Sequence, residues 1–369
     1  MKTQHGEPSF HLGNDALDLH ITARGGHLAP VVFHLPGRDV SPYSLSPWLP
    51  DQHPDLPPLL SVLRGDFLCL PFGPQENGPP HGDTANAEWS LVRQDEQSLH
   101  LALRAADTGA RVDKILTILP GGTAIYCEHR ISGLEGDFNF GNHPVLDLSG
   151  LPDGGGRVSV SPFRYASVYP GWFSNQENGE TQALEPGARF TDLREVPLIA
   201  GGSTDLTRYP ARPGNDDLVM MVSVPASEAQ PFAWSAVVMD GYVWFSLKNP
   251  ADFPATLFWI SNGGRSRSPW NGRHVGRIGV EEVCSHFCDG VDLSSRDLLA
   301  AEGIPTARRF QADEMVSLRT VQAVVAVPEG FGMVESIKPD GAGRVLLTDE
   351  SGSSVGMDLN WRFPNPENP

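Results

Sequence analysis

The stretch VVMDGYVWFSL, residues 237–247, decides the fold class of this chain. Two runs of β-branched and aromatic residues flank the dipeptide Asp240-Gly241. Asp-Gly supplies the positive φ angles of a type I′ turn, which joins two antiparallel strands through only two residues. The stretch therefore predicts a β-hairpin and, around it, an antiparallel sheet.

The rest of the chain carries the same kind of signal. Apolar residues at the 3.6-residue spacing of helices are scarce, whereas strand patterns recur. The 39 Gly and 33 Pro are spread along the chain, as is typical of turns between many short strands. Further strands are predicted at residues 17–22, 99–104, 124–131, 255–261, 321–327 and 345–348. The chain is expected to be all-β, with a sandwich, a large open barrel and a jelly roll as the alternatives.

Two segments depart from the strand pattern. A short helix is predicted at residues 295–302, because Ser294 can cap its first turn and Gly303 follows its last. The proline-rich residues 41–58 contain no strand pattern and are expected to form a long ordered loop over one face. Long loops on β scaffolds often build binding sites.

The length of 369 residues, 40% of them hydrophobic, is enough for one large domain or two ordinary ones. We expect a single domain over residues 1–369. Residues 291–369 are expected to be a C-terminal extension, a short helix followed by strands, that completes the sandwich.

The charge balance limits the partners. The 45 acidic and 27 basic residues give a formal charge of -18, which repels phosphate backbones and anionic lipids. No apolar run approaches the roughly 20 residues of a membrane helix, and the first residues lack the apolar centre of a secretory signal. The four cysteines are too few and too scattered for a disulfide scaffold. We therefore expect a cytoplasmic protein with reduced thiols and without nucleic-acid or membrane partners.

Two histidines lie in segments rich in polar, aromatic and glycine residues. His81, within residues 70–89, could donate a hydrogen bond to a polar ligand beside an aromatic wall formed by Trp89, or it could belong to a surface loop. His143 precedes Pro144, which favours an extended backbone and hence a rigidly placed imidazole. Such a group suits general acid or base catalysis, although a lone histidine is more often structural.

Two adjacent acids, Glu281 and Glu282, interrupt an apolar strand pattern. Burying a carboxylate is costly unless it is paired or hydrogen-bonded, so one of them is expected to face something polar. Neighbouring strand residues point to opposite faces, so only one of the two can enter a given pocket. An edge strand with both acids in water is the alternative.

Three residues near these acids are candidate metal ligands. Cys284, His286 and Cys288 share one strand face, but side chains at this spacing project in parallel instead of converging on an ion. The sequence also lacks the motifs of serine hydrolases, zinc proteases and nucleotide-binding loops. We predict neither a metal site nor a cofactor.

Three of these segments, taken in order, resemble the galactose mutarotase-like superfamily of aldose 1-epimerases and hexose-6-phosphate 1-epimerases. HGDTANAEW (81–89) is similar to the family's H-G-x-x-R-x-x-x-W block, GNHPVLDL (141–148) to its N-H-P-Y-F-x-L block, and IGVEEV (278–283) to its L-G-[IV]-E-P block. Residues 14–33, NDALDLHITARGGHLAPVVF, are similar to the family's opening hairpin with paired glycines.

The resemblance implies a β-supersandwich of large antiparallel sheets with a few short helices and a concave sugar site. Within it, His143 would be the general acid and Glu281 the general base. The residues implied or expected to contact the carbohydrate are His81, Asp83, Trp89, Asn142, Trp270 and Arg273. The implied activity is interconversion of sugar anomers by acid-base ring opening.

The sequence departs from the family pattern at several positions. Ala85 stands where the sugar-phosphate epimerases carry an arginine, and Glu282 stands where the family has proline. Val145 and Leu146 replace the aromatic pair after the acid histidine. Two alternatives therefore remain: a non-catalytic carbohydrate-binding protein of the same fold, and a metal-dependent sugar isomerase or lyase. The sequence also leaves open whether Glu281 or Glu282 is the base.

Overall fold

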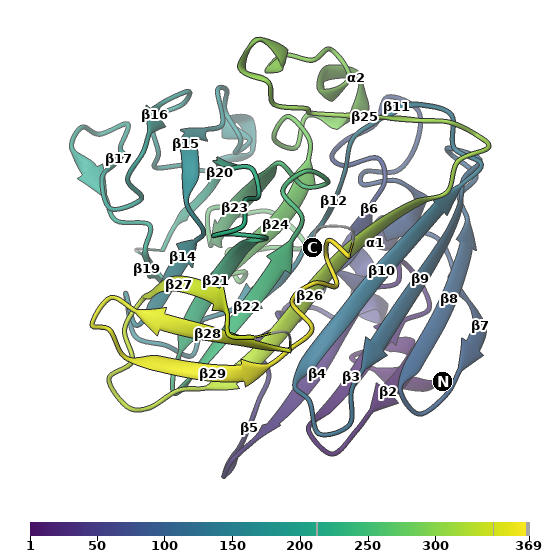
Figure 1. The fold of residues 1–369 in the computed structure, drawn as a ribbon. Coiled ribbons are helices and arrows are strands. Elements are labelled where there is room, and N and C mark those ends of the chain that lie inside the picture. Colours follow the sequence, from purple (N-terminus) through teal and green to yellow (C-terminus); the bar gives the residue numbers. More distant parts are fainter. Residues whose placement is uncertain (212, 342, 367–369) are drawn as a thin grey trace.

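The computed structural model describes residues 1–211, 213–341 and 343–366 (Figure 1). Strands hold 46% of the residues and helices 6%, and the strands form several large antiparallel sheets. This confirms the all-β fold class and the sandwich architecture. None of the helices in the described ranges is long and apolar enough to cross a membrane.

The largest sheet has nine antiparallel strands. Their order is β19 (Arg208–Tyr209), β14 (Gly156–Val160), β21 (Ala233–Met239), β22 (Tyr242–Lys248), β26 (Val316–Ala326), β10 (Ala124–Ser132), β9 (Arg111–Ile118), β8 (Ser98–Arg104) and β7 (Ser90–Gln94). Met239 pairs with Tyr242 across Asp240-Gly241, and Gly241 has a φ of 74°. The predicted hairpin is confirmed, and it lies well inside the sheet. The predicted type I′ turn is wrong, because Asp240 does not have the positive φ that this turn requires at both central residues.

The second sheet has eight strands and carries the candidate site. Its order is β16 (Arg189–Phe190), β15 (Phe163–Val168), β20 (Asn215–Ser223), β23 (Ala255–Asn262), β24 (Arg277–Cys284), β12 (Phe140–Asn142) and β6 (Leu68–Cys69), and β13 (Val145–Asp147) pairs with β24 beside this path. The central strand β24 therefore holds both Glu281 and Glu282.

Smaller elements complete the fold. A five-stranded sheet contains β1 (Lys2–Gln4), β2 (Glu7–Gly13), β3 (Leu17–Thr22), β4 (Leu28–Leu35) and β5 (Arg38–Val40). Two short pairs are β11 (Gly136–Phe138) with β25 (Arg308–Phe310), and β17 (Val196–Pro197) with β18 (Ser203–Thr204). The helices are α1 (Pro58–Val62) and α2 (Gly290–Ser294), with 3-10 turns η1 (Pro50–Gln52), η2 (Asp83–Ala85), η3 (Gln176–Asn178) and η4 (Ala300–Glu302).

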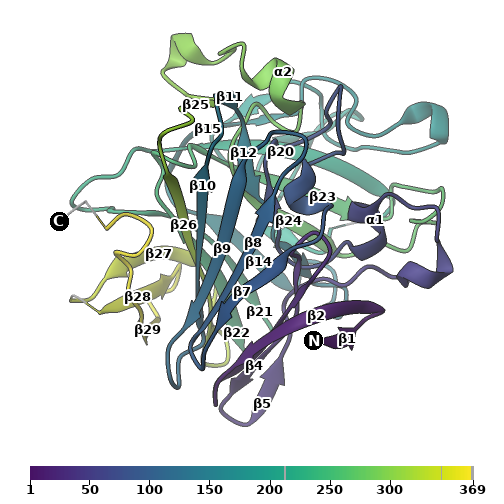
Figure 2. The same cartoon turned by 90° about the vertical axis from the view of Figure 1, so that its right-hand side faces the viewer.

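The main core lies between the nine-stranded and eight-stranded sheets. Trp244 of β22 and Phe258 of β23 both belong to it, whereas their chain neighbours Phe245 and Leu257 belong to two separate apolar clusters. Because successive strand residues point to opposite faces, both large sheets are buried on both sides. Figure 2 shows the nine-stranded sheet as the middle layer.

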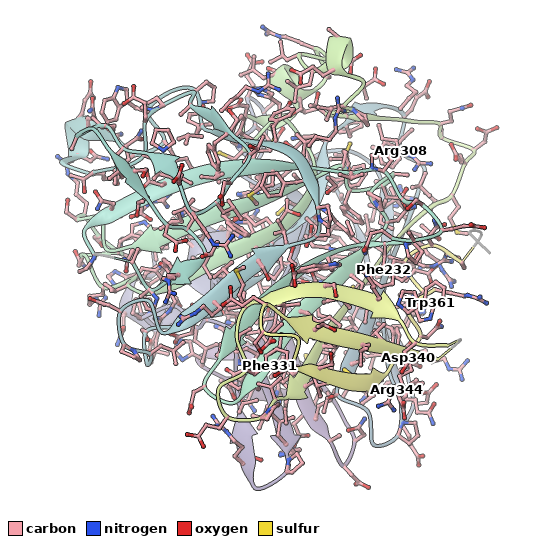
Figure 3. All side chains as sticks on the ribbon, turned by 60° about the vertical axis from the view of Figure 1, so that its left-hand side comes forward. Phe232, Arg308, Phe331, Asp340, Arg344 and Trp361 are labelled. Atoms are coloured by element: carbon pink, nitrogen blue, oxygen red, sulfur yellow. The ribbon has the colours of Figure 1, made fainter. Side chains whose placement is uncertain are left out.

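A three-stranded sheet covers the outer face of the nine-stranded sheet. It consists of β27 (Val334–Pro339), β28 (Arg344–Asp349) and β29 (Ser354–Asp358). Ile337 and Leu347 pack there against Phe245. Figure 3 shows this sheet in front of the strands it covers, with Phe232 and Trp361, whose ring centroids lie 6.1 Å apart, at its side. The last part of the chain thus supplies β26 to the large sheet and then covers that sheet.

The predicted strands are confirmed, but the predicted helix at residues 295–302 is wrong. The structure has α2 before it and the short turn η4 at its end, with irregular chain between. Asp297 has a positive φ of 51°, which no residue of an α-helix adopts. The Ser294 hydroxyl instead accepts from the backbone N–H of His286 and so joins buried loop contacts.

Candidate active site

Side chains alternate between the two faces of β24, and this alternation decides what each of its two glutamates faces. Val280 belongs to the main core between the two large sheets, whereas Val283 belongs to the apolar cluster on the opposite face. Glu282 shares the face of Val280, and Glu281 shares the face of Val283. Glu281 therefore points away from the nine-stranded sheet, into a cavity roofed by loops and by α1.

Glu282 is fully paired in the interior. Its carboxylate accepts hydrogen bonds from the hydroxyls of Ser235, Ser246 and Thr256, each at 2.8 Å. The ammonium Nζ of Lys248 lies 2.6 Å from Glu282 Oε2, and both side chains are almost completely buried. These contacts satisfy the carboxylate and leave Glu282 no access to a substrate.

The cavity has a volume of about 200 Å³. It contains Glu281, together with His81 and His143 from the two motifs of the first half of the chain. The other lining residues are Leu59, Leu60, Leu63, Phe67, Gly73, Pro74, Pro80, Phe173, Leu218, Trp259, Arg265, Trp270 and Cys288. The proline-rich loop, expected to cover one face, leads into α1, whose leucines form part of the cavity wall.

His143 and Glu281 form a close buried pair. Nε2 of His143 lies 3.4 Å from Oε1 of Glu281, and the two residues are 7% and 2% exposed. Burial lowers the pKa of His143 well below its ordinary value, with a further contribution from His81, and it raises the pKa of Glu281 well above its ordinary value. Oε1 of Glu281 and Nδ1 of His143 have no hydrogen-bond partner among the described residues. Two groups able to exchange protons therefore lie together at the cavity, and each has an atom without a hydrogen-bond partner among the described residues.

Gly279 makes the space that the Glu281 carboxyl group occupies. The two residues lie on the same face of β24, two positions apart. A Cβ atom added at Gly279 would lie 2.4 Å from Oε1 of Glu281 and 3.0 Å from Cβ of Trp259. Any side chain there would displace the carboxyl group, so the glycine of the I-G-V-E-E segment fixes where the acid sits.

The backbone and the ring of His143 are both held in place. Its N–H donates to the carbonyl of Phe67 and to Oδ1 of Asp66, each at 3.0 Å. Burial raises the pKa of Asp66 to about 6. The imidazole stacks on the Phe67 ring with centroids 4.6 Å apart, and Phe67 in turn stacks with His27 at 4.1 Å. His27 of the paired-glycine segment thus supports the His143 ring through Phe67.

His81 presents a defined hydrogen-bond donor. Its Nδ1 accepts from the backbone N–H of Gly73 at 3.2 Å, so in the neutral ring the proton lies on Nε2. Burial lowers the pKa of His81 to about 4, which keeps the ring neutral near pH 7. Its centroid lies 5.3 Å from that of His143, at an interplanar angle of 82°.

Arg265 is the cation of the cavity. Its guanidinium carbon lies 4.8 Å from the centroid of Trp270, 5.2 Å from that of Trp259 and 5.5 Å from that of Phe173. Arg277, at the start of β24, instead pairs with the carboxylate of Asp147 at 2.7 Å, outside the cavity. The loop therefore contributes one positive charge and one tryptophan, Trp270, to the site.

Four of the residues predicted to contact the sugar do not line the cavity. Trp89 is 2% exposed and packs in the main core, where its Nε1 donates to the Thr84 carbonyl. A Cβ at Gly26 would lie 2.8 Å from this indole, so Trp89 fills the space beside the paired glycines. The prediction that Trp89 forms a sugar-stacking wall is wrong because its ring is enclosed by protein.

The other three are occupied elsewhere. Asp83 accepts from the backbone N–H groups of Ala106 and Asp107, at 2.6 and 3.3 Å, and so fixes a loop. Asn142 pairs with Glu282 in the strand register and donates to the Thr320 hydroxyl between the sheets. Arg273 is exposed outside the cavity. None of these three side chains lines the cavity, and their contacts with a substrate stay predictions.

Sequence reasoning missed several lining residues. Phe67, Phe173 and Trp259 lie on different strands and loops, and the α1 leucines come from the proline-rich loop. None of them stands in a motif, because an apolar residue on the outer face of this sheet looks the same in sequence as a core residue. Only the aromatic character of residues 259–270 offered a signal.

The cysteine segment does not form a metal site. Within the described ranges, no group of three His, Cys, Asp or Glu residues is arranged to hold an ion. His286 Nδ1 pairs with Asp289 at 2.7 Å, Cys284 contacts the Pro305 carbonyl, and Cys288 lines the cavity. All four cysteines are free thiols.

The overall architecture is the galactose mutarotase-like β-sandwich. Solved structures with this architecture include the galactose mutarotase related enzyme of Lactobacillus acidophilus, with a TM-score of 0.56, 11% identity, and coverage of 87% of this chain and 99% of that chain. A galactose mutarotase-like protein of Lactobacillus casei gives 0.56, 12%, 86% and 100%, and the GalM/aldose epimerase homologue of C. elegans gives 0.55, 12%, 87% and 99%. No protein family and no curated protein matches the sequence. At these identities the likeness establishes the fold.

Proposed function

We propose that this protein interconverts the anomers of a cyclic sugar by opening and closing its ring, with His143 and Glu281 as the proton-transfer pair. One observation carries the proposal: two buried titratable side chains, His143 and Glu281, lie at one cavity with Nε2 and Oε1 3.4 Å apart. Anomerisation removes a proton from the anomeric hydroxyl and delivers one to the ring oxygen. Both oxygens are bonded to the same carbon, so the base and the acid must lie close together.

The pair holds one proton before and after ring opening, because it takes one proton from the sugar and gives one back. In the ion-pair form, imidazolium His143 is the acid and carboxylate Glu281 is the base. Ring opening moves the anomeric hydroxyl proton to Glu281 and the His143 proton to the ring oxygen, which leaves a neutral imidazole and a carboxylic acid. Rotation about the C1–C2 bond and closure reverse both transfers. Burial favours the neutral form of each group, and that neutral pair is the form required beside the open-chain aldehyde.

The surroundings support the same chemistry. The Nε2–H of His81 can donate to a sugar oxygen beside the pair, and its low pKa keeps it from competing as an acid. Trp259 and Trp270 supply aromatic surface of the kind that packs against sugar C–H groups. The proposal includes the cytoplasmic location and the small-molecule sugar substrate expected from the sequence.

The test is anomer exchange measured by NMR. A panel of aldoses, sugar phosphates and uronates is followed with the wild-type protein and with His143→Asn. Exchange faster than the spontaneous rate for some sugar, and lost in the variant, is the expected result. If no sugar exceeds its spontaneous rate while one binds with a measurable Kd, the protein is a carbohydrate-binding module instead.

A further inference from the structure

The cavity is poor in hydrogen-bond acceptors. Among the described residues, no Ser, Thr, Tyr, Asn, Gln or Asp side chain lines it. Its strong side-chain acceptors are His143 and Glu281, which the proposed reaction engages at C1 and the ring oxygen. Nδ1 of His81 already accepts from Gly73.

Two backbone carbonyls at the cavity, those of Gly73 and Pro80, are also engaged. The Gly73 carbonyl accepts from the N–H of His81 at 2.8 Å and from the side-chain amide of Gln75 at 2.9 Å. The Pro80 carbonyl accepts from the side-chain amide of Asn86 at 2.8 Å. Neither carbonyl is an unused partner for a hydroxyl of the substrate.

The remaining polar groups are donors. Arg265 presents guanidinium N–H groups, and His81 presents Nε2–H. The indole N–H of Trp259 is buried without a partner among the described residues. Leucine, phenylalanine and proline side chains supply most of the rest of the lining. Among the described lining residues, a bound molecule therefore meets apolar surface and donors, and it meets strong side-chain acceptors that are not already engaged only at the reacting pair.

This pattern conflicts with a fully hydroxylated hexose. Such a sugar carries four hydroxyl groups besides the anomeric one, and each O–H buried without an acceptor loses the hydrogen bond that it makes in water. An ether oxygen, which accepts and does not donate, or a plain C–H group suffers no such loss in this cavity.

We infer that the substrate is a hydroxyl-poor cyclic hemiacetal, a deoxy or O-alkylated sugar whose oxygen atoms away from C1 accept hydrogen bonds and seldom donate them. This inference rests on the proposed function, because it assigns the anomeric centre to His143 and Glu281. Arg265, His81 and Trp259 would then bind the oxygens that the substrate retains.

The experiment removes hydroxyl groups one at a time at constant stereochemistry. Anomer exchange is measured for D-glucose, 2-deoxy-D-glucose and 2,6-dideoxy-D-arabino-hexose, each as kcat/KM divided by the spontaneous rate of that sugar. We expect an increase of about tenfold for each hydroxyl removed. 3-O-methyl-D-glucose, which masks one hydroxyl, should also exceed glucose. A series that is flat, or that falls as hydroxyls are removed, overturns the inference and leaves the proposed function intact.

A second arm adds an acceptor to the wall. Leu60 lines the cavity and is only partly buried, so Leu60→Gln introduces an amide there at small cost to packing. This variant should shift the preference toward glucose, by reducing the ratio of dideoxy-sugar to glucose activity severalfold. Leu56→Gln is the matched control, because Leu56 is also partly buried but lies outside the cavity lining. An unchanged ratio in Leu60→Gln contradicts the inference.

Binding separates the two proposals. Kd values for the same sugars are measured by NMR titration of His143→Asn. If no sugar is turned over by the wild-type protein, the proposed function fails. The inferred substrate class is then judged by affinity alone. It is refuted if the dideoxy sugar binds no more tightly than glucose.

Discussion

Glu281 and Glu282 are adjacent in the chain, yet their carboxyl groups lie on opposite faces of β24 and have different hydrogen-bond partners. Glu282 is bound by three hydroxyls and by the ammonium of Lys248. Glu281 has His143 at 3.4 Å and no hydrogen bond to Oε1 within the described residues. The first arrangement satisfies a buried charge, and the second leaves an acid available for proton transfer. Substitutions at the two positions should therefore have separable effects.

His143→Asn and Glu281→Gln should each remove roughly 10²-fold or more of the anomer exchange rate, the usual scale for a positioned proton-transfer group. Neither should lower the thermal midpoint much. Glu281→Gln in particular replaces a buried carboxyl that lacks a partner on Oε1 with a neutral group of the same shape. The rate is measured by NMR and the midpoint by circular dichroism. Full activity in either variant would remove that residue from the proposed mechanism.

Glu282→Gln should instead act on stability. It leaves the Lys248 ammonium buried without its counter-ion, a change that typically costs about 3–5 kcal/mol. The free energy of unfolding, measured in urea, should fall accordingly, while the folded fraction at low temperature keeps an exchange rate within a few-fold of wild type. Adding Lys248→Met to Glu282→Gln should recover part of the lost free energy of unfolding, because the unpaired charge is then gone. A silenced but stable Glu282→Gln protein would show that Glu282, not Glu281, is the base.

Gly279→Ala should impair catalysis without altering any proton-transfer group. Its methyl group would lie 2.4 Å from Oε1 of Glu281, so the carboxyl group must leave the position that it now holds 3.4 Å from His143. Because small displacements of a reacting group are costly, we expect a loss of about 10²-fold in kcat. Gly150→Ala is the control, since a Cβ there meets no atom within 4 Å and its φ is not positive. Equal rates in the two variants would contradict this account of the glycine.

The pH dependence of kcat/KM should be bell-shaped and broad. The active free protein holds one proton on the His143–Glu281 pair, so activity is lost when a second proton binds and when the last one leaves. Burial lowers the pKa of His143 below 6.5, which places the acid limb below that pH, and raises the pKa of Glu281 above 4.5, which moves the alkaline limb upward. Initial rates in a series of buffers give both limbs. An acid limb above pH 6.5 would mean that the site stabilises the imidazolium, against the effect of burial.

Much of the fold could be predicted from local sequence. Asp240-Gly241 lies between two β-rich runs, and residues 237–247 form the hairpin that this local pattern predicts, with only Gly241 at a positive φ. The helix prediction failed at residues 295–302, where Ser294 satisfies buried groups of a distant loop instead of capping a helix. A hydrogen bond to a residue far along the chain leaves no trace in the local pattern.

For the candidate site, the sequence by itself determined that Glu281 and Glu282 face opposite sides, because side chains alternate along any strand. It also showed that the segments containing His81, His143 and the two glutamates occur in the same order as the family's three motifs. Only the tertiary structure decided which face carries the cavity, since both faces of this sheet are buried and look alike in sequence. In the folded protein Trp89 is enclosed in the main core, and Asn142 points between the sheets. Helix α1 and Trp259 line the cavity. These choices depend on contacts between segments far apart in the chain, which no local pattern records.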